Sequence, residues 1–314
     1  MAVKGRFAPS PSGRMHLGNL FSALLAWLSV RHEGGSLVLR IEDLDPDRCR
    51  PEYALQLMED LRWLGLDWDE GGEEPAYWQS HREEHYLAAF EALKAGGLLY
   101  PCFCTRQQRL AEAPHGHEVS PSCPCVHLTA EEISKKSTQR PPNWKVRVPD
   151  RAISFSDGLQ GAYSQNMTAQ CGDFPIRRWD GAWAYQLAVV VDDAAMGVTQ
   201  VVRGRDLLSS TPRQLWLYEA LGLTPPTAFY HVPLLVAPDG RRLAKRDADL
   251  DMGALRQLYK PEELLGLLAQ LAGQRDTPAP VTARELAQTF DWSRVPRQDI
   301  PVDGALLCGK KVFS

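Results

Sequence analysis

Two short segments of the chain carry residue types suited to phosphate chemistry. The first, residues 9–19, reads PSPSGRMHLGN and places His16 directly before a run of apolar residues at helical spacing. His16 is therefore expected at a helix N-terminus, where free backbone N–H groups and the helix dipole favour phosphate oxygens. Gly13 and Gly18 would let the backbone approach such a ligand closely. The second segment, residues 241–247, reads RRLAKRD and offers Lys245 as a positive charge for a polyphosphate. Since a histidine before a helix is more often a cap or a surface residue, the His-Leu-Gly triplet alone is weak evidence of catalysis.

Four cysteines form the second cluster with chemical potential. Cys102 and Cys104 make one C-x-C pair, and Cys123 and Cys125 make another, among seven cysteines in the chain. Two close pairs of thiolates can complete a tetrahedral site for zinc, whereas reduced surface thiols are the plainer alternative. We expect a structural Zn²⁺ here. Three histidines remain as substitute ligands: His115, His117 and His127. The other cysteines stand alone in the sequence and are expected to be structural: Cys49, Cys171 and Cys308.

The periodicity of the apolar residues predicts alternating strands and helices in the first part of the chain. Residues 2–8 and 36–42 are strand-like, and each precedes a helix pattern, which begins at His16 in one case and spans 51–64 in the other. The first of these helices is expected to be amphipathic, with apolar residues at helical spacing: Leu17, Leu20, Phe21, Leu24, Leu25 and Leu28. A further helix is expected from a capping box of Ser80 and Glu83 to the glycines at 96 and 97.

The pattern changes at about residue 100 and resumes after residue 178. The stretch between contains cysteines, prolines and short strand-like pieces such as 144–148, so we interpret it as an inserted subdomain. The alternation resumes at 183–191 and continues through 198–202, a helix near 211–221 and a strand near 231–236. Beyond residue 247 the chain is expected to be helical, with these leucines in its core: Leu255, Leu258, Leu264, Leu265, Leu267 and Leu268.

The predicted fold class is α/β, with a Rossmann-type, doubly wound parallel sheet, an inserted cysteine-rich subdomain and a small helical C-terminal region. The two halves of the core are expected at residues 1–99 and 179–240, and the insertion with its zinc site at 100–178. Residues 241–314 would hold the second phosphate segment and the helical region.

Composition is that of an ordinary globular protein, with 44% hydrophobic and 24% charged residues over 314 positions. No apolar run approaches the roughly twenty residues of a membrane span, and the N-terminus does not resemble a signal peptide. We therefore expect no membrane partner and a cytoplasmic location. A monomer is also expected, although no pattern in the sequence specifies it. The net charge of −4 does not point to a nucleic-acid binder, but a local basic face would be enough for one.

The stretch from Arg6 to Asn19 resembles the signature of class I aminoacyl-tRNA synthetases, and its form RFAPSPSG resembles their glutamyl branch. Residues 242–246 resemble the lysine loop of the same enzymes. The resemblance implies that both segments bind one ATP, accompanied by Mg²⁺, and that an amino acid is activated as its adenylate. His16 would donate to the α-phosphate and Lys245 would neutralise the triphosphate. The residues assigned to ATP in this way are Pro9, Ser12, Gly13, His16, Gly18, Asn19, Leu243 and Lys245.

The chain departs from the family pattern at three places. The lysine loop has Ala244 where a serine is common, and Asn19 ends the first motif where the family has a histidine or a small residue. Relatives with a zinc site at this point often use a tyrosine that stands four residues before a cysteine. Val119 and Pro121 occupy those positions here, so a tyrosine ligand is not expected.

A pocket for free glutamate would need cations for two carboxylates and an anion for the ammonium group. Arginine suits a carboxylate because its planar fork donates two hydrogen bonds, and Arg6 and Arg203 are the leading candidates. Glu42 would receive the ammonium group. The resemblance implies a glutamate site lined by Arg6, Ala8, Ser10, Glu42, Tyr185 and Arg203. Without the resemblance, Arg203 would be interpreted as a solvated charge at a strand end and Tyr185 as a core aromatic residue.

The length of the chain favours the shorter members of the glutamyl branch, the glutamyl-queuosine tRNA(Asp) synthetases. Longer members continue past the lysine loop into an anticodon-binding domain. In this chain only the stretch from Asp247 to Ser314 follows that loop. The resemblance implies activation of L-glutamate without tRNA, and its transfer to queuosine at the wobble position of tRNA(Asp), whose anticodon arm the core would hold. Two alternatives remain: a truncated enzyme that charges the 3′ end of tRNA(Glu), and a non-catalytic paralogue that binds glutamate, nucleotide or tRNA.

Overall fold

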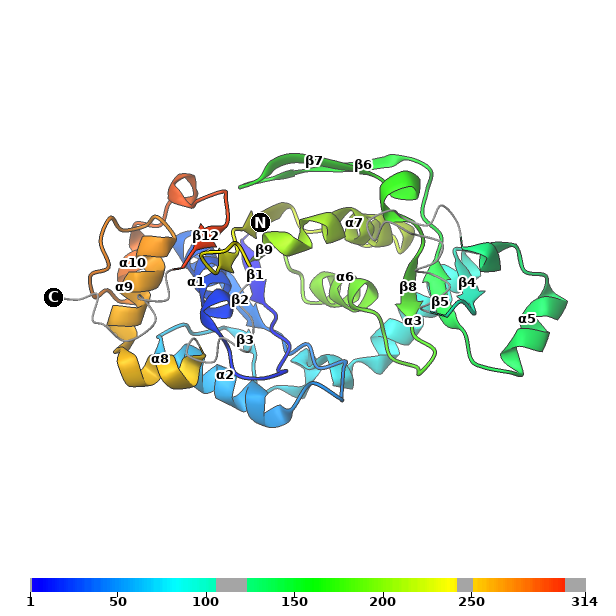
Figure 1. Cartoon of the computed structure of the whole chain (residues 1–314), viewed down its shortest axis with the longest axis horizontal. Helices are drawn as coiled ribbons and strands as arrows, with labels where there is room; N and C mark the ends of the chain where they lie inside the picture. The colour runs from blue at the N-terminus through cyan, green and yellow to red at the C-terminus, as the bar shows by residue number, and fades with distance from the viewer. Residues whose placement is uncertain (1, 106–122, 242–250, 303–314) are drawn as a thin grey trace.

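A five-stranded parallel sheet is the largest described sheet of the computed structural model, which describes residues 2–105, 123–241 and 251–302 (Figure 1). Its strands are β1 (Lys4–Phe7), β2 (Ser36–Leu39), β3 (Glu70–Gly71), β9 (Gln200–Gly204) and β10 (Ala228–Val232). The order is β10-β9-β1-β2-β3, and every neighbouring pair is parallel. The chain order reverses between β1 and β9, which is where open α/β sheets bind ligands. The predicted doubly wound sheet is confirmed.

Helices cover both faces of this sheet. On one face, α1 (Leu17–His32) packs with α10 (Ala283–Gln288), and Leu37 and Leu39 of β2 point into the same cluster. On the other face, Val38 packs in a small cluster between the sheet and the segment after α6 (Tyr185–Ala195). Helix α7 (Thr211–Ala220) packs against α6. The alternation along β2 therefore buries successive side chains on opposite sides of the sheet.

Helix α1 is buried on nearly all sides, so the predicted amphipathic pattern is wrong. Besides the expected apolar stripe, Ala23, Ala26, Trp27 and Val30 are also buried. The reason is that α1 lies between the sheet and the C-terminal helices α9 (Pro261–Leu271) and α10. Packing is close at Gly5 of β1, where an added Cβ would lie 2.4 Å from Val30 Cγ2.

Two further predictions need correction. Helices α2 (Pro51–Trp63) and α3 (Glu83–Ala95) form as expected, but Arg82 precedes α3 and no side chain caps it. Ser80 instead donates its hydroxyl to Asp43, 2.6 Å away, so the capping box is absent. In the C-terminal region, α8 (Met252–Leu258) and α9 bury the expected leucines except Leu258, which is 41% exposed at the end of its helix. Residues 183–191 contain the start of α6.

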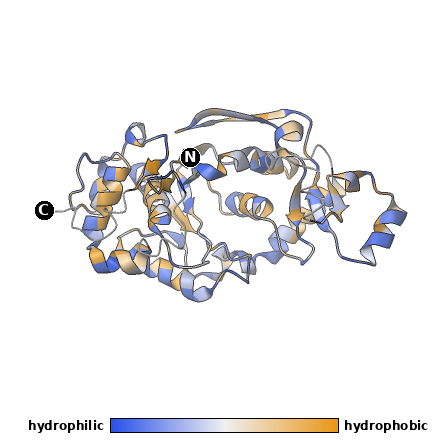
Figure 2. Ribbon diagram, viewed as in Figure 1, coloured by the Kyte–Doolittle hydropathy of each residue, from blue (hydrophilic) through white to orange (hydrophobic). Residues whose placement is uncertain are grey.

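The cysteine-rich region forms a separate layer beside the core (Figure 1). Strands β4 (Leu99–Cys102), β5 (Asn143–Val146) and β8 (Phe174–Arg177) make an antiparallel sheet. Helix α5 (Ala130–Ser137) buries none of its residues and is largely hydrophilic (Figure 2). The hairpin of β6 (Ala152–Asp157) and β7 (Gly161–Asn166) runs back along α7 and reaches β10 of the core (Figure 1).

A short parallel pair, β11 (Leu235–Val236) and β12 (Ile300–Pro301), completes the described elements of the fold. Among the residues that the structure describes, no helix has both the length and the apolar character needed to cross a membrane.

Candidate active site

A cavity of about 440 Å³ lies at the carboxyl ends of β1 and β9, at the reversal of the sheet order. Residues after β1, the first turn of α1 and the end of β9 form its walls. Every described residue of the predicted nucleotide and glutamate sites lines it: Arg6, Ala8, Pro9, Ser10, Ser12, Gly13, His16, Gly18, Asn19, Glu42, Tyr185 and Arg203. Leu243 and Lys245 lie outside the described residues. The structure thus brings the predicted residues together, while their individual ligands stay a prediction.

His16 is the N-cap of α1 as well as a wall of the cavity. Its Nδ1 accepts a hydrogen bond from the Gly18 backbone N–H at 3.2 Å, so a neutral ring carries its proton on Nε2. Asn19 Oδ1 accepts from the His16 backbone N–H at 3.2 Å, which completes a capping box. Asn19, which departs from the family pattern, therefore holds the start of the helix. Gly13 adopts a φ of 150°, which favours glycine.

The segment that contains Lys245, residues 242–250, lies outside the described residues, but the described residues on either side of it, Arg241 and Asp251, are close to residues of this cavity. Before the segment, the Ala237 N–H donates to the Arg241 carbonyl oxygen at 2.7 Å, just after cavity residues 233–235. After the segment, Asp251 pairs with His16 in an antiparallel bridge, and the Met252 N–H donates to the Met15 carbonyl oxygen at 2.9 Å. The chain on the far side of Lys245 thus returns to the start of α1.

Arg203 is buried and incompletely paired. Its Nη2 donates to Thr211 Oγ1 at 2.8 Å, while its Nη1 makes no hydrogen bond to a described protein group. A buried guanidinium nitrogen without a partner is costly, so this geometry favours an anion such as a carboxylate in the cavity. The side chain is only 5% exposed, so the interpretation of Arg203 as a solvated charge is wrong. Arg6 is equally buried; it donates from Nη1 to the Val202 carbonyl oxygen at 3.0 Å and lies 3.6 Å from Asp193.

A chain of buried polar groups fixes the orientation of Arg203. Its Nε donates to His231 Nε2 at 3.0 Å, so the His231 proton lies on Nδ1, which donates to Asp157 Oδ2 at 2.6 Å. Asp157 is at the tip of the β6–β7 hairpin, so the insertion contributes to this site. Burial lowers the pKa of His231 despite the hydrogen bond to Asp157, and keeps the ring neutral. Burial alone would raise the pKa of Asp157, but hydrogen bonds from His231 and backbone N–H groups lower it.

Glu42 belongs to a buried ionic network behind the cavity. Arg40, which is fully buried, donates to Glu42 at 3.1 Å and to Asp193 at 2.5 Å. Burial raises the pKa of Glu42, and Arg40 opposes that effect only in part. Asp192 accepts hydrogen bonds from Arg82 at 2.6 Å, and from Gln79 and Tyr86. A bound ammonium group would add a further cation beside Glu42 and stabilise its charged form.

Sequence analysis missed His231, Asp157, Arg40 and the two aspartates of α6. The only signal was their position: Arg40 lies two residues before Glu42, and the aspartates follow an apolar run at 187–191. Charged residues within or directly after buried apolar runs require partners, and that rule would have identified Arg40 and the aspartates.

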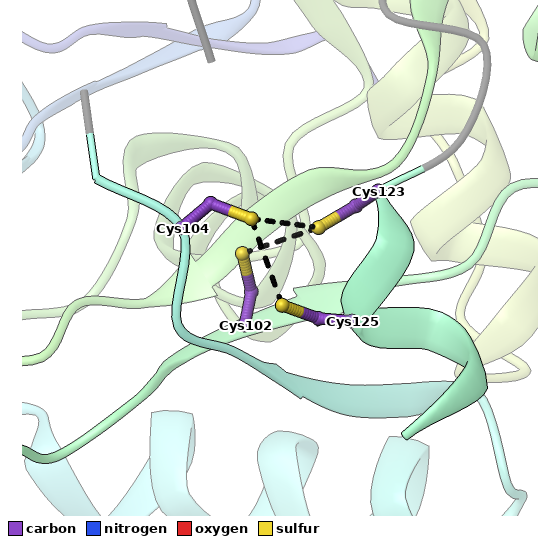
Figure 3. A group of neighbouring side chains, drawn as sticks. All are labelled: Cys102, Cys104, Cys123 and Cys125. Carbon is purple, nitrogen blue, oxygen red and sulfur yellow. Dashed lines mark hydrogen bonds between the residues drawn. The ribbon is translucent and has the colours of Figure 1, made fainter. Parts of the chain in front are cut away.

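The four paired cysteines come together in the insertion (Figure 3). Their sulfur atoms lie within 4.8 Å of one another, with Cys102–Cys123 at 3.4 Å and Cys104–Cys125 at 3.6 Å. Disulfide bonds are about 2.05 Å long, so these are free thiols. The exposed His127 is not part of the cluster, and His115 and His117 lie outside the described residues. Cys49 and Cys171 are buried away from the cluster, and Cys308 is not described.

Comparison with known proteins gives a consistent picture. The model of the family described as "tRNA synthetases class I (E and Q), catalytic domain" matches residues 2–302. A protein of Symbiobacterium thermophilum named Glutamyl-Q tRNA(Asp) synthetase is 50% identical over 309 residues, 95% of each chain. A protein of Nitratidesulfovibrio vulgaris with the same name is 47% identical over 315 residues, 97% of each chain. A solved glutamate tRNA ligase from Elizabethkingia meningosepticum, in complex with its amino acid, has a TM-score of 0.83 and 29% identity. That match covers 99% of this chain and 68% of the ligase.

Proposed function

Since the chain belongs to the class I tRNA synthetases of the E and Q type, we propose that it activates L-glutamate with ATP and transfers it to queuosine in tRNA(Asp). Activation takes place without tRNA, and the acceptor is the modified base at the wobble position. The observation that carries this proposal is the match over nearly the full length of relatives named for that reaction. The cavity supports it, because its buried, incompletely paired Arg203 suits a carboxylate.

In the first step, a glutamate carboxylate oxygen attacks the α-phosphorus of ATP and pyrophosphate leaves. Arg203 and Arg6 bind the side-chain carboxylate of glutamate, which does not react, and Glu42 receives the ammonium group. His16 and the N-terminus of α1 donate to the α-phosphate, where negative charge grows in the transition state. Lys245 neutralises the triphosphate, and Mg²⁺ arrives with the nucleotide. In the second step, a hydroxyl of queuosine attacks the glutamyl carbonyl, an ester forms, and AMP leaves with the bonding electrons while the hydroxyl proton is released.

We further propose that Cys102, Cys104, Cys123 and Cys125 hold one structural Zn²⁺. A tetrahedral site with Zn–S bonds of about 2.3 Å has sulfur–sulfur edges of about 3.8 Å. The three sulfur separations of 3.4 to 3.6 Å are close to that edge length, and all four sulfur atoms lie within 4.8 Å of one another, so the donor set fits the metal without a tyrosine. The Phe103 N–H donates to Cys125 Sγ at 3.3 Å and would stabilise a bound thiolate. The metal would cross-link β4 to the segment that precedes α5.

The test is to incubate the protein with labelled glutamate and ATP, and with tRNA(Asp) that either contains or lacks queuosine. We expect pyrophosphate exchange without tRNA, and label on the tRNA only when queuosine is present. An anticodon stem-loop that contains queuosine is expected to serve as a substrate by itself. Label on the terminal adenosine of tRNA(Glu) would instead identify an enzyme that charges the 3′ end, and absence of any adenylate would identify a non-catalytic binder. We propose that the protein acts as a monomer in the cytoplasm, and gel filtration with light scattering tests the oligomeric state.

A further inference from the structure

A second cavity of about 360 Å³ adjoins the first and has no role in the chemistry described so far. The two cavities share the walls made by Ser10, Ser12, Glu42 and Tyr185. Its remaining walls come from two segments far apart in the sequence and from Gln79. Residues 44–49 contribute Leu44, Asp45, Arg48 and Cys49, and the turn between β8 and α6 contributes Arg178, Ala182 and Trp183.

The position of this second cavity suits a group that must meet the glutamyl carbonyl. Glutamate and ATP together occupy the first cavity in the proposed reaction, so an acceptor hydroxyl has to arrive from another side. The shared walls at Glu42 and Tyr185 are those of the proposed glutamate end, whereas His16 and the start of α1 line only the first cavity. An acceptor in the second cavity would therefore approach the amino acid without displacing the nucleotide.

The walls of this cavity have the chemistry for a nucleoside. Asp45 supplies a carboxylate that can accept from hydroxyl groups, and Arg48 and Arg178 supply positive charge for nearby phosphates. Trp183 is held in place by its Nε1–H bond to Glu83 at 2.5 Å and by the Arg177 guanidinium 4.5 Å from its ring centre. Next to Arg178 in the turn, Trp179 is 59% exposed. An exposed aromatic ring beside a basic residue is suited to stacking against an unpaired RNA base.

We propose that this second cavity is the acceptor subsite, which binds an RNA nucleoside that presents a vicinal diol, with Asp45 on the diol and Arg178 on the backbone. The assignment rests on the proposed function, which supplies the glutamyl group. Two nucleosides share this chemistry: queuosine, through its cyclopentenediol, and a 3′-terminal adenosine, through its ribose. The tRNA that the wild-type protein labels, tRNA(Asp) or tRNA(Glu), shows which of the two nucleosides it binds.

The experiment compares Asp45→Asn and Arg178→Gln with two controls. Asp180→Asn removes the ion-pair partner of Arg178, 2.6 Å away, but keeps the arginine. Arg151→Gln removes an equally exposed arginine, paired with Glu219, that lines neither cavity. One measurement is glutamate-dependent pyrophosphate exchange without tRNA. The other is single-turnover transfer from preformed enzyme-bound adenylate to tRNA(Asp) containing queuosine.

We expect exchange to stay within about twofold of wild type in all four variants. Transfer is expected to fall roughly tenfold or more in Asp45→Asn, and the half-saturating tRNA concentration to rise about threefold or more in Arg178→Gln. Both controls are expected to behave as wild type. Unchanged transfer in both test variants, or an equal fall in exchange and transfer, would overturn the assignment. A wild-type protein that labels no tRNA would overturn the proposed function, and that result precedes any variant. If the wild-type protein labels tRNA(Glu) and the two test variants lose that label, the cavity is still the acceptor subsite, but its nucleoside is the terminal adenosine.

Discussion

At the scale of residues, the site depends on buried charges that the protein leaves incompletely paired. Arg203 receives support from Thr211 and His231, but its Nη1 still lacks a hydrogen-bond partner among the described residues. A ligand carboxylate would supply that partner. An unpaired buried charge is costly, so we expect Arg203 to favour glutamate over ligands that lack this carboxylate.

Replacement of Arg203 tests this selectivity. Arg203→Ala is expected to raise the KM for glutamate about tenfold or more, because the substrate carboxylate loses a charged hydrogen-bond partner worth roughly 1.5–3 kcal/mol. The KM for ATP is expected to change little, and Lys245→Ala is expected to slow adenylate formation while glutamate affinity stays nearly unchanged. Pyrophosphate exchange measures both constants. Arg205→Ala is the control, since Arg205 is partly exposed and pairs with Asp299 outside the cavity. Equal changes for both substrates in Arg203→Ala would mean that the two subsites are misplaced.

The neutral state of His231 predicts a pH dependence of stability. Burial lowers its folded-state pKa, so the unfolded chain, with a histidine pKa of about 6.5, takes up the proton first as the pH falls. The stability that this group contributes is complete above about pH 6.5 and is lost as the pH falls toward the folded-state pKa. We expect the difference in unfolding free energy between wild type and His231→Gln to shrink between pH 7.5 and 5.5, as measured by urea denaturation. A constant difference would show that His231 does not titrate in this way.

At the scale of elements, close backbone packing sets the height of α1 over the sheet. A Cβ added to Gly5 of β1 would lie so close to Val30 Cγ2 of α1 that one of the two elements would have to shift. The same helix presents its N-terminus to the cavity, so its packing against β1 also positions His16. Contact between these two elements therefore links the core to the site.

This contact can be tested by a double-mutant cycle. Gly5→Ala is expected to destabilise the protein by about 1–3 kcal/mol, because its Cβ would overlap Val30 Cγ2. Adding Val30→Ala is expected to recover part of that loss, so the double variant would be more stable than the sum of the single effects implies. Denaturant unfolding provides the three free energies. Gly96→Ala is the control, since its Cβ would meet no atom closer than Ala92 O at 3.5 Å. Additive losses would contradict the overlap.

The insertion is expected to depend on the proposed zinc, because its described part is rich in loops and adds a small core of its own. Elemental analysis is expected to find about one zinc per chain in wild type, and less in Cys123→Ser and Cys125→Ser. Both variants and the chelated protein are expected to melt at lower temperature. Cys171→Ser, which alters a buried cysteine outside the cluster, is expected to keep the metal. Metal-free protein with an unchanged melting temperature would exclude a structural zinc.

At the scale of the whole molecule, the core and the insertion meet at the site. Asp157, at the tip of the β6–β7 hairpin, accepts a hydrogen bond from His231 of the core, and Asp251 of the C-terminal region forms a β-bridge with His16. A ligand that fills the first cavity therefore touches groups supported by all of these regions. Such a ligand is expected to stabilise the molecule as a whole.

A non-hydrolysable analogue of glutamyl adenylate tests this expectation. At a hundred times its dissociation constant it is expected to add about 2.7 kcal/mol to the unfolding free energy, with no tRNA present. The glutaminyl analogue at the same concentration is expected to add much less, because its amide leaves the Arg203 charge without a carboxylate. Thermal unfolding in the presence of each analogue gives the comparison. Equal stabilisation by the two, or a requirement for tRNA, would contradict the tRNA-independent glutamate site.

The parts that the sequence by itself determined are those specified by neighbouring residues. The strand before residues 9–19 and the helix that begins after His16 depend on short spacings, and both are confirmed. The two C-x-C pairs lie together in one cluster, while the zinc stays a prediction. The alternation of strands and helices was enough to predict the doubly wound sheet, whose reversal point holds the cavity. Local patterns carry this information because hydrogen bonds within helices and side-chain alternation in strands are themselves local.

Only the tertiary structure decided which polar groups are buried together. Ser80 donates a hydrogen bond to Asp43 and does not cap a helix. Leu258 is exposed, although the apolar pattern predicted it in the core. His231 and Asp157, which orient Arg203, lie 74 residues apart in the sequence. Considered alone, neither the histidine nor the aspartate indicates that its side chain is buried. Their burial and pairing arise from contacts between the hairpin and β10, and no spacing along the chain encodes such contacts.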